Sequence, residues 1–177
     1  MNQEALMALA DPSKGQYFLT APDKLALIID AADIRPGDKV VEIGAGVGTI
    51  AQALPRSASL TLVEFDGRLI DSLKQNVPHA VVLNADGVTL LRDGALTCDV
   101  MLSNLPHGIT PSLIALLPHI EFRTAVISMS STEPLDALAG ELEYSLLTST
   151  EGDDFTPSQP TRSILVRVNK RAAGRAS

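Results

Sequence analysis

Short apolar runs alternate along this chain with segments whose apolar residues recur every three to four positions. The runs have the length of buried strands, and the helical spacing is typical of helices that cover a sheet. This alternation predicts a parallel sheet with helices on both faces. Strands are expected over 39–43, 60–64, 80–84, 99–103, 124–129, 144–148 and 163–169, and helices over 3–10, from Pro22, and over 50–54, 69–76, 111–117 and 134–142.

The first expected strand of this sheet runs into a glycine-rich turn. Glycine permits a sharp turn and leaves no side chain between the backbone and a ligand. Open α/β sheets bind nucleotides at this place, the carboxyl end of the first strand. The spacing Gly-x-Gly-x-Gly departs from the dinucleotide fingerprint at its third glycine. We assign the turn to a cofactor site, with a ligand-free turn as the alternative; its residues are Glu42, Gly44, Ala45, Gly46 and Gly48.

Acidic residues end the next two expected strands. Glu64 lies about 20 residues after the turn, where a carboxylate accepts hydrogen bonds from ribose hydroxyls in dinucleotide-binding folds. Asp86 is placed to accept from an adenine amino group, although many strands simply end in Asp. The residues that follow the two acids, Phe65 and Gly87, are assigned to the same site.

Asn104-Leu105-Pro106-His107 follows the fourth strand and is the candidate reaction site. An exocyclic amine of a nucleobase is a poor nucleophile because its lone pair is delocalised into the ring. Two acceptors on its N–H groups favour a pyramidal, attacking geometry. The side-chain oxygen of Asn104 and the carbonyl of Leu105 or Pro106 can supply them, and the ring of His107 can stack on the base. The alternative is a structural turn made rigid by proline.

Phe155 and Pro157 lie in a proline-rich loop before the last expected strand. An aromatic ring there can form the second wall of a base-binding site. The alternative, which we weigh almost equally, is that Phe155 packs the loop against the core.

Composition narrows the remaining possibilities. The single cysteine, Cys98, excludes an internal disulfide and a cysteine-based metal cluster, and no histidine has metal-ligand spacing, so no metal is expected. No apolar run reaches the length of a membrane span and no signal peptide is apparent, so we expect no membrane partner and a cytoplasmic location. The net charge is −7, but residues 155–177 contain five basic residues and no acid. This basic end, 170–177 above all, is either an RNA contact or a solvated tail.

Taken together, these segments resemble the ribosomal RNA adenine N6-dimethyltransferases. Gly15-Gln16-Tyr17-Phe18-Leu19 is similar to that family's Gly-Gln-Asn-Phe-Leu, and Asn104-Leu-Pro-His to its Asn-Leu-Pro-Tyr. The glycine turn, Glu64, Asp86 and the loop from Phe155 to Ser163 correspond in the same order. The resemblance implies a class I, Rossmann-like methyltransferase fold with seven strands, the last one antiparallel. It also implies S-adenosylmethionine (SAM) as the cofactor, with Gln16, Tyr17, Leu19 and Asn104 among the residues that bind it.

Three features differ from this family. His107 replaces the aromatic residue of its catalytic motif. The segment 129–155 is short and lacks the basic residues that face RNA, and the C-terminal helical domain is absent from the sequence. We expect one methyltransferase domain over 1–177, with a helical cap segment over 1–36.

Three functions therefore stay open at this point. The first is N-methylation of an adenine-like amine on RNA, as the resemblance implies. The second is methylation of a small molecule, such as a nucleoside or a secondary metabolite. The third is SAM binding without catalysis. The oligomeric state is left open.

Overall fold

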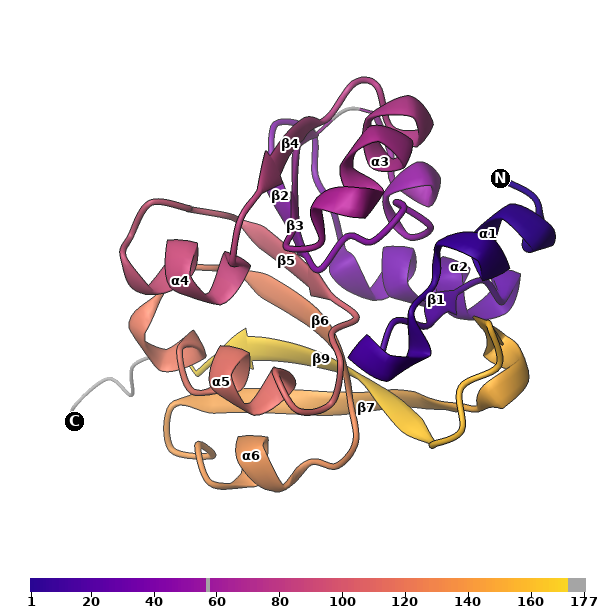
Figure 1. The fold of residues 1–177 in the computed structure, drawn as a ribbon. Coiled ribbons are helices and arrows are strands. Elements are labelled where there is room, and N and C mark those ends of the chain that lie inside the picture. Colours follow the sequence, from indigo (N-terminus) through magenta and orange to yellow (C-terminus); the bar gives the residue numbers. More distant parts are fainter. Residues whose placement is uncertain (57, 172–177) are drawn as a thin grey trace, which may run out of the picture.

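The computed structural model describes residues 1–56 and 58–171, and its main feature is a seven-stranded sheet (Figure 1). The strand order is β4-β3-β2-β5-β6-β9-β7. All neighbours from β4 to β6 are parallel, whereas β9 runs antiparallel to both β6 and β7. The predicted fold, with its antiparallel last strand, is confirmed. The strands are β2 (Lys39–Ile43), β3 (Ser59–Glu64), β4 (Val81–Asn84), β5 (Val100–Ser103), β6 (Thr124–Met129), β7 (Leu142–Thr150) and β9 (Ser163–Lys170).

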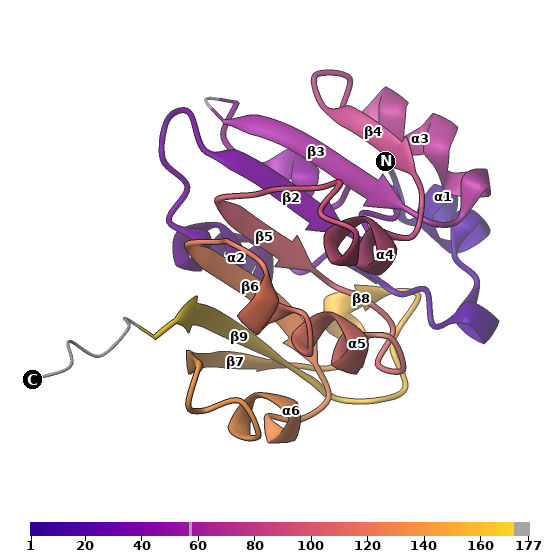
Figure 2. The ribbon, with the colours of Figure 1, turned by 90° about the vertical axis from the view of Figure 1, so that its left-hand side faces the viewer.

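Helices cover both faces of this sheet, as Figure 2 shows. Alternate residues of β2 point to opposite faces, so Val40 packs in one core and Val41 in the other. The first core is closed by α2 (Pro22–Ala32), η2 (Ala51–Ala53) and α3 (Ile70–Asn76), which follows η3 (Gly67–Leu69). The second is closed by α4 (Gly87–Arg92), α5 (Thr110–Ile114), η4 (Leu117–His119) and α6 (Glu133–Asp136).

The N-terminal segment lies beside the carboxyl ends of the first strands. It comprises α1 (Gln3–Leu9), η1 (Pro12–Lys14) and β1 (Phe18–Leu19). β1 pairs antiparallel with β8 (Phe155–Thr156), which follows η5 (Gly152–Asp154). Residues 1–36 thus hold two α-helices and one strand of two residues, and α2 packs on the main sheet. That they form a helical cap stays a prediction. The expectation of a single domain stays a prediction.

Three other expectations need correction. The helix expected over 134–142 ends at Asp136, and Leu142 already begins β7, where it pairs with the end of β9. Helix α4 was missed because it has only six residues, too few for an apolar period to show. Of the expected basic tail, Lys170 ends β9 and contacts Glu121 at 3.5 Å, and the backbone N–H of Arg171 donates to Glu141. Residues 172–177 lie outside the described residues.

The part of the chain that the structure describes contains neither a membrane-spanning helix nor a metal-binding cluster of side chains. Among residues 1–56 and 58–171, no helix has the length and apolar character that crossing a bilayer requires. In the same residues, no group of three His, Cys, Asp or Glu side chains is arranged to hold a metal ion.

Candidate active site

A cavity of about 690 Å³ opens at the carboxyl ends of β2, β3 and β5. Ligands of open α/β sheets bind at this edge because connections diverge there and leave a crevice. Residues 14–18 of the N-terminal segment form part of its wall. The predicted site residues that line this cavity are Gln16, Tyr17, Glu42, Gly44, Ala45, Gly46, Glu64, Phe65, Asp86, Gly87, Asn104, Leu105 and Pro106.

The glycine turn is shaped by left-handed backbone at each of its glycines. Gly44 has φ of 75° and Gly46 has φ of 57°, values that residues other than glycine rarely adopt. A Cβ on Gly44 would lie 2.5 Å from Leu105, and one on Gly46 would lie 2.9 Å from the ring of Phe18. The turn therefore needs glycine for close packing against its own neighbours as well as for ligand access.

Glu64 joins the end of β3 to this turn. Its Oε2 accepts from the backbone N–H of Gly46 at 2.8 Å, and its Oε1 accepts from that of Asp66 at 2.7 Å. The residue is only 7% exposed, and burial raises the pKa of its carboxyl. Each carboxylate oxygen has a second lone pair, so Glu64 can hold the turn and still accept hydrogen bonds from a ligand.

Glu42 contributes a second carboxyl group to the cavity wall. The residue is 1% exposed, and its Oε2 has no hydrogen-bond partner among the described residues. Burial, followed by the charge of Glu64, raises its pKa from 4.5 to about 8. A buried acceptor without a partner is costly for the protein, and a cationic ligand group would relieve this cost.

Asp86 has a structural role that the sequence analysis did not assign. Its Oδ1 accepts from the backbone N–H of Val88 at 3.0 Å and caps α4, while its Oδ2 accepts from the hydroxyl of Thr89 at 3.1 Å. A Cβ on Gly87 would meet Ile43 at 2.7 Å, so that glycine packs α4 onto β2. Phe65 is 77% exposed and offers a bare aromatic ring at the wall of the cavity.

The turn after β5 presents Asn104 to the cavity. Its side-chain Nδ2 donates to the carbonyl oxygen of Tyr17 at 3.3 Å, which leaves Oδ1 as the acceptor of the amide. The carbonyl of Pro106 already accepts from the backbone N–H of Ile109 at 2.9 Å in the first turn before α5. Of the two backbone acceptors considered, Leu105 is therefore the better candidate.

Five residues that the sequence assigned to the site do not line this cavity. His107 does not line the cavity; its Nε2 is hydrogen-bonded to Ser163 Oγ at 2.8 Å, at the start of β9. Phe155 is 4% exposed and packs in the core, so the alternative of a core contact holds. Leu19 is fully buried in the same core, Gly48 packs against Leu73 and Val77, and Pro157 lines a second hollow beside α1.

Several cavity residues had no sequence signal of their own. They are ordinary polar or apolar residues that the fold brings to one wall, because α4, α5 and the N-terminal segment meet there. The N-terminal ones, Lys14 and Phe18, adjoin a segment that the family resemblance had already marked. The others that matter for the wall are Thr49, Asp66, Thr89, Arg92, Ile109 and Ser112.

The sheet order and the position of this cavity define a class I methyltransferase fold. Solved structures agree: a dimethyladenosine transferase from Plasmodium falciparum superposes with a TM-score of 0.77 at 22% identity, covering 87% of this chain and 63% of that one. The 23S rRNA methyltransferase ErmE gives a TM-score of 0.74 at 23% identity, covering 88% and 70%.

Sequence comparison then gives the family. A family model described as ribosomal RNA adenine dimethylase matches residues 8–131, and this chain belongs to that family. It is 34% identical over 143 residues to the ribosomal RNA small subunit methyltransferase A of Prosthecochloris aestuarii, covering 75% of this chain and 54% of the relative. The protein of the same name from Corynebacterium efficiens is 33% identical, with 71% and 47% covered. The chain thus spans about half the length of these relatives.

Proposed function

We propose that the cavity binds SAM. SAM carries an ammonium group, a ribose diol and an adenine ring, and the wall offers a group for each. Glu42 Oε2 is a buried acceptor without a partner among the described residues, which suits the ammonium. Glu64 has lone pairs for the diol, and the exposed ring of Phe65 can stack on adenine. The residues present therefore fit this cofactor.

We propose that the reaction is N-methylation of an adenine amine in RNA. Membership of the ribosomal RNA adenine dimethylase family supports the acceptor class. When bound, SAM supplies a methyl group on a good leaving group, so the protein's task is mainly to position the amine. Asn104 Oδ1 and the Leu105 carbonyl accept from its two N–H groups and favour the pyramidal geometry. The hydrogen bond from Asn104 Nδ2 to the carbonyl of Tyr17 keeps this acceptor in place.

One observation supports this proposal: Glu64, which ends β3, and Asn104, which follows β5, line the same cavity. Transfer between two bound molecules requires that the cofactor acid and the acceptor for the amine share one surface.

The experiment is methyl transfer from radiolabelled SAM, with total RNA, free adenosine and a metabolite extract as parallel acceptors. After nuclease digestion of the RNA, we expect label in N6-methylated adenosine. Asn104→Ala should lose this signal. Label only in the nucleoside or metabolite samples would replace RNA by a small molecule as the acceptor. Label in none of them, with SAM bound, would mean that the protein binds the cofactor without catalysis.

A further inference from the structure

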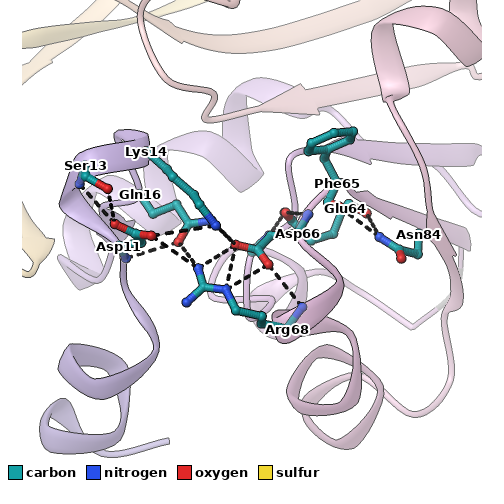
Figure 3. A network of polar contacts seen from close by, with 10 residues as sticks. Asp11, Ser13, Lys14, Gln16, Glu64, Phe65, Asp66, Arg68 and Asn84 are labelled. Carbon is teal, nitrogen blue, oxygen red and sulfur yellow. Dashed lines mark hydrogen bonds and ion pairs between the residues drawn. The ribbon is translucent and has the colours of Figure 1, made fainter.

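Asp66, which follows β3, connects the N-terminal segment to the wall of the cavity. It lies two residues after Glu64 and lines the cavity. Lys14 Nζ donates to Asp66 Oδ2 at 3.1 Å, and Gln16 Nε2 donates to the same oxygen at 3.0 Å. In Figure 3 both of these side chains point toward the Asp66 carboxylate. Two contacts thus join positions 52 and 50 residues apart along the chain.

Arg68 holds this carboxylate in place from its own side. Its Nε donates to Asp66 Oδ1 at 3.1 Å, and its guanidinium lies 3.6 Å from Asp11 (Figure 3). The hydrogen bond from Arg68 keeps the pKa of Asp66 well below its ordinary value. The Asp66 side chain is only 10% exposed, so its charge is less screened than that of a free surface acid. Asp66 is therefore an anion that three donors share at the edge of the cavity.

The segment that Asp66 holds also contacts the candidate reaction site. The carbonyl of Tyr17 accepts the hydrogen bond that orients Asn104, and a Cβ on Gly15 would lie 3.0 Å from Pro106. Residues 14–18, which we call the strap, line the cavity between these two contacts. Alternate residues of the strap thus face two walls: Lys14 and Gln16 contact Asp66, next to Glu64. Gly15 and Tyr17 lie against the turn of Asn104.

We propose that Asp66 is a positioning residue, which holds the strap closed over the bound cofactor and thereby keeps Asn104 oriented. This inference rests on the proposed function. A closed strap slows the escape of the cofactor, and it fixes the carbonyl on which the Asn104 amide depends. Because its contacts are charged and partly exposed, salt weakens them.

The test is Asp66→Asn in the full chain. Asn keeps the size of the side chain, an oxygen that can accept from the backbone N–H of Arg68, and the backbone N–H that Glu64 accepts from. It removes the charge and puts a donor in place of the oxygen that accepts from Lys14 and Gln16. Lys14→Gln weakens the contact between the strap and Asp66 from the side of the strap. Asp71→Asn, at an exposed acid on α3, is the matched control.

Three readouts are measured: SAM affinity by calorimetry at low and high salt, hydrogen exchange of peptides covering 11–18, and turnover. We expect Asp66→Asn to weaken SAM binding about tenfold at low salt, comparable to the loss of one charge-assisted contact. We expect its affinity to lose most of the salt dependence seen in the wild type, and exchange in 11–18 to rise. Lys14→Gln should act in the same direction, and Asp71→Asn should match the wild type.

The proposed function and the positioning role of Asp66 are contradicted by different outcomes. A wild-type protein that binds no SAM contradicts the proposed function itself. A wild-type protein that binds SAM, with Asp66→Asn equal to it in affinity, salt dependence and exchange, overturns the positioning role alone. A lower melting temperature of Asp66→Asn with all three readouts unchanged has the same meaning, because it leaves Asp66 with a purely structural ion pair.

Discussion

The side-chain amide of Asn104 donates a hydrogen bond to the backbone carbonyl of Tyr17 at 3.3 Å. This contact joins the turn after β5 to a segment 87 residues earlier in the chain. It fixes the orientation of the amide, since the nitrogen, its only donor, is bound to Tyr17. Asn104 Oδ1 is therefore available for an amine before any acceptor arrives.

Asn104→Ala should consequently reduce turnover while SAM affinity changes little. The lost acceptor is needed chiefly when the amine becomes pyramidal, so the effect belongs to the transition state. We expect a decrease of about 10²-fold, as for one preorganised polar contact. Single-turnover kinetics measures the first quantity and calorimetry the second. A variant with wild-type turnover would make this motif a structural turn only.

Gly46→Ala should destabilise the protein more than Gly94→Ala. Both glycines have positive φ, 57° and 68°, so both substitutions carry the backbone strain of about 1–2 kcal/mol. Only at Gly46 does the new Cβ meet a neighbour, the ring of Phe18 at 2.9 Å, whereas no atom lies within 4 Å at Gly94. Denaturant unfolding of the two variants gives the comparison. Equal losses would show that Phe18 moves away freely.

His107→Ala should cost stability without weakening SAM binding. The substitution removes the contact between His107 Nε2 and Ser163 Oγ, and Ser163 is only 1% exposed. We expect a loss of roughly 1 kcal/mol, typical of one hydrogen bond. Ser163 keeps its contact with Gln159 at 2.8 Å, which limits the loss. A large decrease in SAM affinity would instead place this ring inside the site.

The free energy of unfolding should fall as pH rises from about 4.5 to about 8. The pKa of Glu42 is raised from 4.5 to about 8, so between these values the folded state binds a proton that the unfolded state has lost. The stabilisation is complete below pH 4.5 and disappears through pH 8, with a size on the order of a few kcal/mol. Asp66, whose pKa is lowered, acts with the opposite sign and only at acidic pH.

Glu42→Gln isolates this effect, because glutamine keeps the volume and removes the titration. We expect its stability to depend less on pH than that of the wild type, with the two curves converging toward pH 4.5. Urea unfolding at several pH values between 5 and 8 measures both. Parallel curves for the two proteins would mean that Glu42 is already charged in the folded state.

The sequence predicted the regular elements that have strong local signals. β2 and β6 have the predicted bounds, since each is a short, largely apolar run that ends at a turn. The parallel direction of most strands followed from the alternation of strands with helices, and the antiparallel last strand from the family resemblance, whereas the order of the strands was not predicted. The end of α6 was missed because residues 137–141 keep a helix-like composition, and only pairing with β9 makes Leu142 a strand residue.

Site residues were predicted where a single residue carries a sequence signal. They were missed where contacts between distant parts of the chain determine the position of the side chain. Glu64 and Asn104 line the cavity as expected, because each ends a strand at the same edge. For Phe155 the sequence left a base contact and a core contact open, since its burial depends on the pairing of β1 with β8, two strands of two residues each. The contacts of Lys14 and Arg68 with Asp66 could not be predicted from the sequence, because no motif or regular spacing joins these three residues.

Calorimetric titration of SAM into the wild type and Glu64→Ala tests the central claim most directly. We expect saturable binding to the wild type, with affinity in Glu64→Ala reduced by roughly 1–3 kcal/mol because ligand hydroxyls lose a charged acceptor. Asp71→Asn, an exposed acid outside the cavity, should bind like the wild type. Absence of SAM binding to the wild type, or equal affinity in folded Glu64→Ala, would contradict the assignment of this cavity to the cofactor.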